Sequence, residues 1–246
     1  MDARKIGILV TRPQPQAQPL IDGLAQLGLA VWHLPLIRIQ TVPPSPMPAW
    51  TGFDGALFSS AHAVQAARET LPPEFWHWLA SVPVGVVGTA TATSLRQNGI
   101  QPVLVPGVHS AQGLSAELLA QPNKLGKKIL HLCGNLTPAA FFLPLTQVGI
   151  FISPCVLYRT STIHYPKADW NTVCQQVDWL TFASGSAVQA FVENAGTGRH
   201  KKVAFCLGKH TQQTAQAVGF GNTVLASENS NAGLLASVAD YWVKLD

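Results

Sequence analysis

Two similar stretches of the sequence have glycine and hydroxyl residues where a strand is expected to pass into a helix. In the first, 84–95, an apolar run ends at Gly88, and in the second, 203–215, a similar run ends at Gly208. Such a turn directs free backbone N–H groups and the positive end of a helix dipole toward whatever lies above it. Both stretches therefore predict a turn that can bind an anion.

Other patterns that could carry catalysis are weak. The sequence contains no G-x-S-x-G, no G-x-G-x-x-G and no G-x-x-x-x-G-K-[ST]. This argues against a hydrolase triad, a dinucleotide and a nucleoside triphosphate. His131 and Cys133 could be metal ligands, but they share one face of a predicted strand, and further ligands at zinc-like spacing are missing, so a core face is favoured. Asp54 and Asp178 open predicted strands, where capping or turn roles suit them better than catalysis.

Composition limits the class of protein further. The chain has 246 residues, which is long enough to bury the core of one large domain or of two small ones. Of these residues, 47% are apolar and 11% are charged. The net charge of +4 comes from scattered Lys and Arg residues, so nucleic-acid binding is not favoured, whereas an anionic small ligand is. The four cysteines form no C-x-x-C pair, and we expect buried free thiols in a reducing compartment. Without a signal peptide or a membrane-spanning run, we expect a soluble, cytoplasmic protein.

The sequence repeats itself after about 120 residues. Residues 53–66 match 177–190, and the stretch around Gly88 matches that around Gly208. The chain thus holds two diverged copies of one α/β unit, which predicts two similar lobes with a cleft between them. Because ligands lie at the carboxyl ends of strands in open α/β sheets, four turns are expected to line that cleft. These turns are 59–60, 88–91, 184–186 and 208–211.

Hydrophobic periodicity predicts alternating strands and helices along the chain. Strands are expected at 5–10, 29–39, 53–58, 84–87, 102–105, 126–132, 150–158, 177–182, 202–207 and 224–226. Helices are expected at 16–27, 63–69, 74–79, 89–98, 112–119, 139–147, 186–194, 211–218 and 232–244. The proline-rich stretch 43–48 is interpreted as a linker and a domain boundary. Trp50, Trp76 and Trp78 look exposed, which leaves dimer formation open.

An ordered set of short motifs resembles the uroporphyrinogen-III synthase family. The motifs are Ile8-Leu9-Val10-Thr11-Arg12-Pro13, Phe58-Ser59-Ser60 with Ala63-Val64, Val87-Gly88-Thr89-Ala90-Thr91, Leu157-Tyr158-Arg159-Thr160, Phe182-Ala183-Ser184 and Leu207-Gly208-Lys209-His210-Thr211. The resemblance implies two flavodoxin-like lobes, each a parallel sheet flanked by helices. One lobe would be 1–38 plus 162–246 and the other 39–161, joined by two crossing strands around Ile37 and Tyr158.

The resemblance also implies a reaction without a cofactor. The substrate would be hydroxymethylbilane, a linear tetrapyrrole with eight carboxylates, which loses its hydroxyl as water. The resulting cation attacks the far ring at its substituted carbon and gives a spiro intermediate, and that ring recloses inverted to yield uroporphyrinogen III. Uncatalysed closure gives the type I isomer instead. The expected partner is this small molecule, with no nucleic acid and no membrane, and the chain is expected to act as a monomer.

Residue roles follow from the resemblance only where positions match. Tyr158 would be the donor that assists departure of the hydroxyl, and its alternative is a packed strand aromatic. Thr91 and Thr211 would contact substrate, or simply cap their helices. Arg12 would face the cleft, or lie in solvent at the end of its strand. The predicted substrate-binding residues are Arg12, Ser59, Ser60, Ala61, Gly88, Thr91, Ser184, Gly185, Ser186, Gly208, Lys209 and Thr211, and no metal ligand is predicted.

Two departures from the family pattern leave other functions open. The first turn has Ser60-Ala61-His62 where the family often has Ser-Pro-Asn, and Cys133 precedes Gly134 where the family often has Arg. One cationic contact is therefore missing. The alternatives are a cytoplasmic two-lobed protein that binds an anion without reaction, and a degenerate synthase without catalytic activity.

Overall fold

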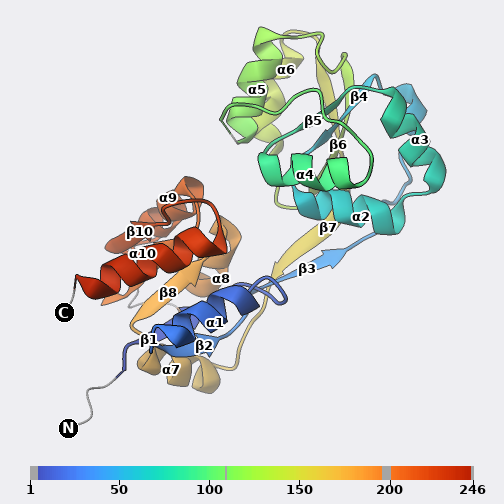
Figure 1. Cartoon of the computed structure of the whole chain (residues 1–246). Coiled ribbons are helices and arrows are strands. Elements are labelled where there is room, and N and C mark those ends of the chain that lie inside the picture. The colour runs from blue at the N-terminus through green and yellow to red at the C-terminus, as the bar shows by residue number, and fades with distance from the viewer. Residues whose placement is uncertain (1–4, 109, 196–200, 245–246) are drawn as a thin grey trace. The chain divides into compact units, whose positions relative to one another are not determined.

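The computed structural model describes residues 5–108, 110–195 and 201–244. The chain divides into two compact units, coloured by residue number in Figure 1. Unit 1 combines the residues up to Arg38 with those from Ser161 onward, and unit 2 is Ile39–Thr160. The chain passes between the units twice, within strands β3 (Ile37–Thr41) and β7 (Phe151–Thr162).

Unit 1 is built on a parallel sheet, sheet A, with strand order β10-β9-β8-β1-β2. Its strands are β1 (Gly7–Val10), β2 (Ala30–His33), β8 (Trp179–Phe182), β9 (Val203–Cys206) and β10 (Asn222–Leu225). Its helices are α1 (Gln18–Gln26), α7 (Lys167–Gln176), α8 (Gly185–Ala195), α9 (Lys209–Ala217) and α10 (Asn231–Val243). Helices α1 and α10 cover one face through Leu24 and Val238, and α7, α8 and α9 cover the other through Trp170, Phe191 and Ala215.

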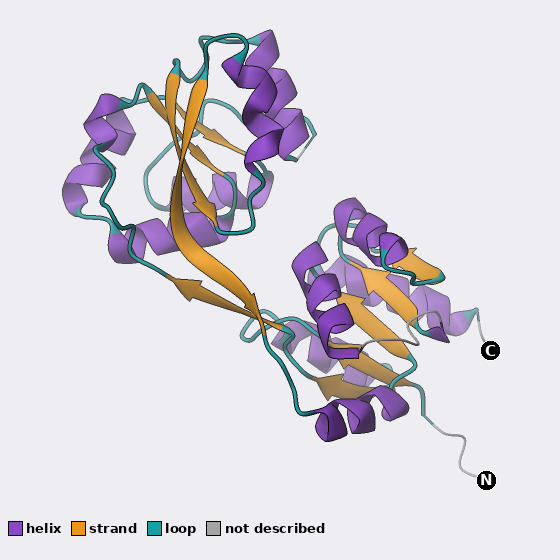
Figure 2. Cartoon of the chain, turned by 180° about the vertical axis from the view of Figure 1, so that it is seen from behind, coloured by secondary structure: helices purple, strands orange, loops and turns teal. Residues whose placement is uncertain are grey.

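Unit 2 is built on sheet B, with strand order β3-β7-β6-β4-β5. Its other strands are β4 (Gly55–Phe58), β5 (Val84–Val86) and β6 (Lys128–Gly134). Its helices are α2 (Ala61–Thr70), α3 (Pro73–Ser81), α4 (Thr89–Gln97), α5 (Ala111–Ala120) and α6 (Leu143–Thr146), with 3-10 turns at Trp50–Gly52 and Ala139–Phe142. Figure 2 shows helices on both faces of this sheet. Helices α2, α3 and α4 share one core with the sheet, and α5 and α6 share the other.

The sequence explains why these segments form these elements. The central strands are apolar throughout, as the four buried residues of β4 illustrate, because a parallel strand is covered on both faces. Several helices begin at a serine whose hydroxyl accepts a backbone N–H, as Ser110 does for α5 and Ser230 for α10. Helices α4 and α9 are terminated by Gly99 and Gly219, which have φ values of +77° and +94° that favour glycine.

The predicted α/β fold with two similar lobes is confirmed, and the strands of the two sheets occupy corresponding places, although the chain enters sheet B at a different strand. The order β2-β1-β8-β9-β10 in sheet A corresponds to β7-β6-β4-β5 in sheet B, followed by a single parallel bridge from Gly85 to Leu104. Numbered along the chain, sheet A has the flavodoxin-like order 2-1-3-4-5, and sheet B is a circular permutation of it. The repeat is also visible in detail, because Asp178 Oδ2 accepts from Gly7 N–H and Asp54 Oδ2 accepts from Lys128 N–H, each at the amino end of a central strand.

Sheet B has one antiparallel pair, which lies where the chain passes between the units. Val42 N–H donates to Leu157 O, and Ile163 N–H donates to Leu36 O. Residue numbers rise along β3 as they fall along β7, so the two strands run in opposite directions, and Arg38 lies opposite Ser161.

Some elements differ from the sequence prediction. The expected strand 29–39 is two strands in two sheets, because Pro35 separates β2 from β3. The boundary between the units falls within β3, so the proline-rich stretch 43–48 lies inside unit 2. Residues 102–105 form only one bridge, and 139–147 form a 3-10 turn followed by the short α6. Helix α7 was not predicted at all.

The three tryptophans expected at the surface are half-buried instead. Trp50, Trp76 and Trp78 pack around Phe75, with ring centroids 5.7, 5.9 and 5.4 Å from it. They therefore close one edge of the core of unit 2. In the described residues no helix is long and apolar enough to cross a membrane.

Candidate functional site

The carboxyl edge of sheet B brings together residues from three neighbouring strands. Ser59 and Ser60 follow β4 directly, Gly134 ends β6, and Tyr158 of β7 is the register partner of Gly134. The register of β6 against β7 shifts between Cys133 and Gly134, which is an irregularity at the end of the ladder. In flavodoxin-like sheets this edge is where ligands bind.

Ser60 is the N-cap of α2 and contacts Tyr158 with the same hydroxyl. Its Oγ accepts from Ala63 N–H at 3.1 Å and lies 2.9 Å from the Tyr158 hydroxyl oxygen. The first turn of α2 thus reaches the phenol through one side chain. Ala61 opens this helix and is half-buried.

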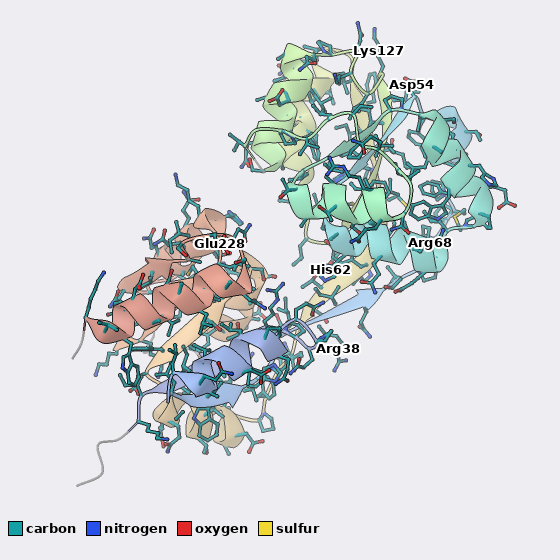
Figure 3. All side chains as sticks on the ribbon, in the orientation of Figure 1. Arg38, Asp54, His62, Arg68, Lys127 and Glu228 are labelled. Atoms are coloured by element: carbon teal, nitrogen blue, oxygen red, sulfur yellow. The ribbon has the colours of Figure 1, made fainter. Side chains whose placement is uncertain are left out.

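Tyr158 is held from three sides. A Cβ on Gly134 would lie 2.4 Å from the Cζ of the tyrosine, so the ring packs directly on a glycine. His62 of α2 contributes a second ring, with its centroid 5.9 Å away; Figure 3 shows His62 beside β7. Burial raises the pKa of the Tyr158 phenol, whereas the hydrogen bond with Ser60 lowers it and nearby Cys133 raises it.

In the described part of unit 2, four buried side-chain atoms have no hydrogen-bond partner. They are Ser59 Oγ, Trp76 Nε1, Ser115 Oγ and His131 Nε2. The His131 ring lies against Phe142 with centroids 5.1 Å apart, and burial lowers its pKa to about 4. His131 is therefore a neutral core residue, as the core-face interpretation predicts. In the described ranges no group of three His, Cys, Asp or Glu side chains could hold a metal ion.

The carboxyl edge of sheet A carries the corresponding turns of unit 1. Ser184 precedes α8, accepts from Ala187 N–H at 3.3 Å and lies 2.9 Å from the Ser186 hydroxyl. Arg12, which follows β1, donates from Nη1 to Asn231 Oδ1 at 2.9 Å, and burial lowers the pKa of its guanidinium. Arg12 is thus half-buried and held by the first residue of α10, rather than lying free in solvent as one alternative had it.

The two glycine turns differ from the prediction in one respect. Gly88 and Gly208 are the N-caps of α4 and α9, and a Cβ on Gly208 would meet nothing within 4 Å. Thr91 and Thr211 are the third helical residues and are buried, so the alternative that they cap these helices is wrong. Lys209 is exposed at the start of α9.

Sequence reasoning missed three residues of these edges. Gly134 supports the Tyr158 ring, His62 lies beside it, and Asn231 holds Arg12. The sequence did offer a signal for Gly134, because a glycine follows a predicted strand there. That Tyr158 packs on this glycine depends on the register of β6 against β7, which the sequence does not show. Gly185 was predicted, and a Cβ there would lie 3.0 Å from Thr214 Oγ1, so α8 and α9 approach closely at this point.

The carboxyl edges of sheets A and B carry mainly backbone amides and hydroxyl groups, together with the phenol of Tyr158 and few charged groups. Helix N-termini and hydroxyls suit carboxylate groups, and a phenol can donate a proton or a hydrogen bond. Asp54 lies away from these edges, since Figure 3 shows it with Lys127 at the far end of unit 2 from His62, whereas Glu228 lies in the turn between β10 and α10 at the carboxyl edge of sheet A. Asp54 Oδ2 accepts from the backbone N–H groups of Lys127 and Lys128, which lowers the pKa of its carboxyl and makes its role structural.

Comparisons with known proteins agree on one family. The family model described as uroporphyrinogen-III synthase HemD matches residues 18–236. The uroporphyrinogen-III synthase of Escherichia coli K12 is 30% identical over 195 residues, which is 75% of this chain and 78% of that protein. The corresponding protein of Chlorobaculum parvum is 32% identical over 197 residues, or 77% of this chain and 79% of that one.

A solved structure supports the fold independently. The crystal structure of a mutant uroporphyrinogen III synthase from the extremely thermophilic bacterium Thermus thermophilus aligns with a TM-score of 0.72 and 14% identity, and the alignment covers 98% of this chain and 100% of that one. Since the family model matches most of the chain, and relatives at about 30% identity match three quarters of it, this chain belongs to the uroporphyrinogen-III synthase family.

Proposed function

We propose that this protein closes hydroxymethylbilane to uroporphyrinogen III, and that Tyr158 assists loss of the substrate hydroxyl. Membership of the family supports the reaction. The observation that carries the role of Tyr158 is its phenol at the carboxyl edge of sheet B, hydrogen-bonded to the serine that caps α2. A phenol that is half-buried and protonated near neutrality is suited to donate.

The proposed reaction begins when the Tyr158 O–H donates to the hydroxyl of the substrate. The C–O bond breaks, its electron pair leaves with the oxygen as water, and the adjacent pyrrole supplies electrons to the carbon left behind. That carbon bonds to the substituted carbon of the far ring, which gives a spiro intermediate. The ring then fragments and recloses in the inverted sense. The proton released when the last pyrrole regains aromaticity returns to the phenolate, so no cofactor is consumed.

We propose that the turns of both sheets bind the carboxylates of the substrate. On sheet B these are the turns at Ser60 and Gly88, and on sheet A those at Ser184 and Gly208 together with Arg12. Holding the substrate in one conformation is the main requirement, because the isomer formed depends on which carbon the cation reaches. All of these turns belong to one chain, which supports a monomer as the active form; analytical ultracentrifugation of the active protein would test this.

The test of function is the isomer of the product. We expect the wild-type protein to give type III product from hydroxymethylbilane, as resolved by chromatography of the oxidised porphyrins. A protein that only binds the substrate, or a degenerate synthase lacking the usual arginine before Gly134, would leave type I product from uncatalysed closure. That outcome would contradict the proposal.

The test of mechanism is Tyr158→Phe. We expect kcat for type III product to fall by roughly 100-fold, because the variant lacks the donor. A matched control is Tyr241→Phe, which removes a phenol that accepts from Asn222 in unit 1, and it should retain the activity. Full activity in Tyr158→Phe, with the same circular dichroism as wild type, would remove Tyr158 from the mechanism.

A further inference from the structure

The hydroxyl of Ser60 is in an unusual position, since it connects a helix terminus to the proposed donor. A serine hydroxyl has one proton and two lone pairs. Ala63 N–H uses one lone pair of Ser60 Oγ at 3.1 Å. The proton and the second lone pair remain, and the Tyr158 hydroxyl oxygen lies 2.9 Å away. Ser60 can therefore accept from the phenol or donate to it, by rotation of one O–H bond.

We propose that Ser60 is a positioning residue that fixes the Tyr158 phenol and donates to its oxygen as the phenol gives up its proton. This inference rests on the proposed role of Tyr158 as the donor. Before reaction, the phenol donates to Ser60 or to the substrate. When the Tyr158 O–H bond breaks and the proton moves to the departing hydroxyl, the negative charge on the phenolate oxygen is met by the Ser60 O–H.

The connection to α2 makes this donation stronger than that of an isolated serine. The amide of Ala63 polarises Ser60 Oγ, and hydrogen bonds in such a chain reinforce one another. The N-terminus of α2 also carries the positive end of its dipole, which favours negative charge nearby. The direction of the Ser60 effect on the phenol agrees, because this hydrogen bond lowers the pKa of Tyr158 against the effect of burial.

Gly134 completes the arrangement from the other side of the ring. Its Cα lies under Tyr158, and a methyl group there would come within 2.4 Å of Cζ and 2.7 Å of the hydroxyl oxygen. Its φ is not among the positive values of the described glycines, so an alanine is excluded by the ring and not by the backbone. The glycine thus sets how closely the phenol approaches Ser60.

The first experiment compares Ser60→Ala with Ser60→Thr and Ser110→Ala. We expect Ser60→Ala to lower kcat by roughly ten- to hundredfold, the size of one hydrogen bond to a charged group, with a smaller change in KM. Ser60→Thr keeps the hydroxyl and should restore most of kcat. Ser110 caps α5 of the same unit through Gly113 N–H at 3.0 Å, so Ser110→Ala should lose a comparable cap and keep kcat.

The second experiment measures the phenol directly. The sequence has three tyrosines, so a protein labelled with tyrosine ¹³Cζ gives three signals to titrate. We expect Ser60→Ala to raise the pKa of Tyr158 and leave those of the other two unchanged. Among the described residues, the His62 ring of α2 lies beside Tyr158 and Cys133 of β6 acts on it electrostatically, and both are retained in every variant.

Two further variants keep the inference testable if Ser60→Ala fails to fold. Ser60→Gly removes the hydroxyl but retains a residue type that N-caps well, and it should reproduce the loss of kcat. Gly134→Ala should lose activity to a similar degree because it displaces the ring. In a Tyr158→Phe background, Ser60→Ala should cause no further loss of kcat, since its effect passes through the phenol.

The outcomes separate this inference from the proposed function. If wild type makes type III product but Ser60→Ala and Ser60→Gly both keep its kcat, or leave the Tyr158 pKa unchanged, the role of Ser60 is wrong and the function stands. If wild type makes only type I product, the function is wrong. An unchanged Tyr158 pKa in Ser60→Ala would then refute the link between the two residues as well.

Discussion

The buried imidazole of His131 has a consequence for stability that is separate from catalysis. Its Nε2 has no hydrogen-bond partner within the described part of the chain, and its pKa is lowered to about 4 from 6.5. In the unfolded chain the imidazole regains its ordinary pKa. As pH falls below 6.5, the unfolded state therefore takes up the proton first, and the folded state is destabilised until the pH reaches about 4.

This predicts a stability profile that depends on one residue. The free energy of unfolding of wild type should be fully retained above pH 6.5 and should fall below it by up to about 1.4 kcal/mol per pH unit. His131→Leu should lack that component, and at pH 7 it should be no less stable, since it removes an unsatisfied polar atom. Urea unfolding at pH 7, 5.5 and 4.5 measures this. The exposed His77 provides the control, and His77→Gln should keep the wild-type slope; equal slopes in all three proteins would contradict the prediction.

At the scale of secondary structure, the internal repeat made most elements predictable. The matches around Gly88 and Gly208 located two strand–turn–helix units, and both form as expected, as β5 with α4 and β9 with α9. The residues of the candidate site that lie in such units were accessible from sequence, Ser60 and Ser184 among them. Each follows an apolar strand and precedes a helical pattern, which is a local signal.

The remaining elements depend on information that is not local. Helix α7 buries only Trp170, so its sequence shows little helical periodicity. The split of 29–39 into two strands depends on which sheet each half joins. The contact between Gly134 and Tyr158 depends on the register of β6 against β7, including its irregularity, and no motif encodes that register. The hydrogen bond between Tyr158 and Ser60 could not be predicted from the sequence for the same reason.

The two helix-terminating glycines give a prediction about elements. Gly99 and Gly219 have positive φ, and a Cβ on either would meet nothing within 4 Å, so strain in the backbone is the only cost of alanine. We expect Gly99→Ala and Gly219→Ala each to lower the free energy of unfolding by about 1 kcal/mol.

The matched control for these variants is Gly52→Ala, where space is equally open and φ is not positive. This change should be neutral or slightly stabilising, because alanine restricts the unfolded chain. Thermal or urea unfolding of the three variants would measure the difference. A similar loss of stability in all three would show that backbone conformation is not the cause.

At the scale of the whole chain, the two sequence repeats and the two structural units do not coincide. Strands β1 and β2 come from the first repeat, yet they share sheet A with β8, β9 and β10 of the second. Sheet B likewise combines β4 and β5 of the first repeat with β6 and β7 of the second. Each unit therefore takes its first β-α-β segment from one repeat and its remaining strands from the other.

This arrangement predicts which fragments fold. Residues 39–160 contain nearly all of sheet B with both of its helical layers and should fold alone, as a dispersed NMR spectrum and cooperative urea unfolding would show. The control is the fragment 1–124, a similar length that contains one complete repeat. It lacks the central strands β6 and β8 and should remain unfolded. A folded 1–124 with an unfolded 39–160 would contradict the assignment of units.

The register of β3 against β7 also has a consequence for how the protein is made on the ribosome. Arg38 and Ser161 lie opposite each other, so everything between them enters and leaves unit 1 at one point, like an insertion in a finished domain. Strands β1 and β2 are synthesised first, but β8, which pairs with β1, emerges more than a hundred residues later. The later-starting unit is thus complete before the earlier one, and the apolar strand Gly7–Val10 has β2 available early but lacks its other neighbour, β8, until late in synthesis. We therefore expect a chaperone that binds exposed apolar segments to bind this strand during synthesis.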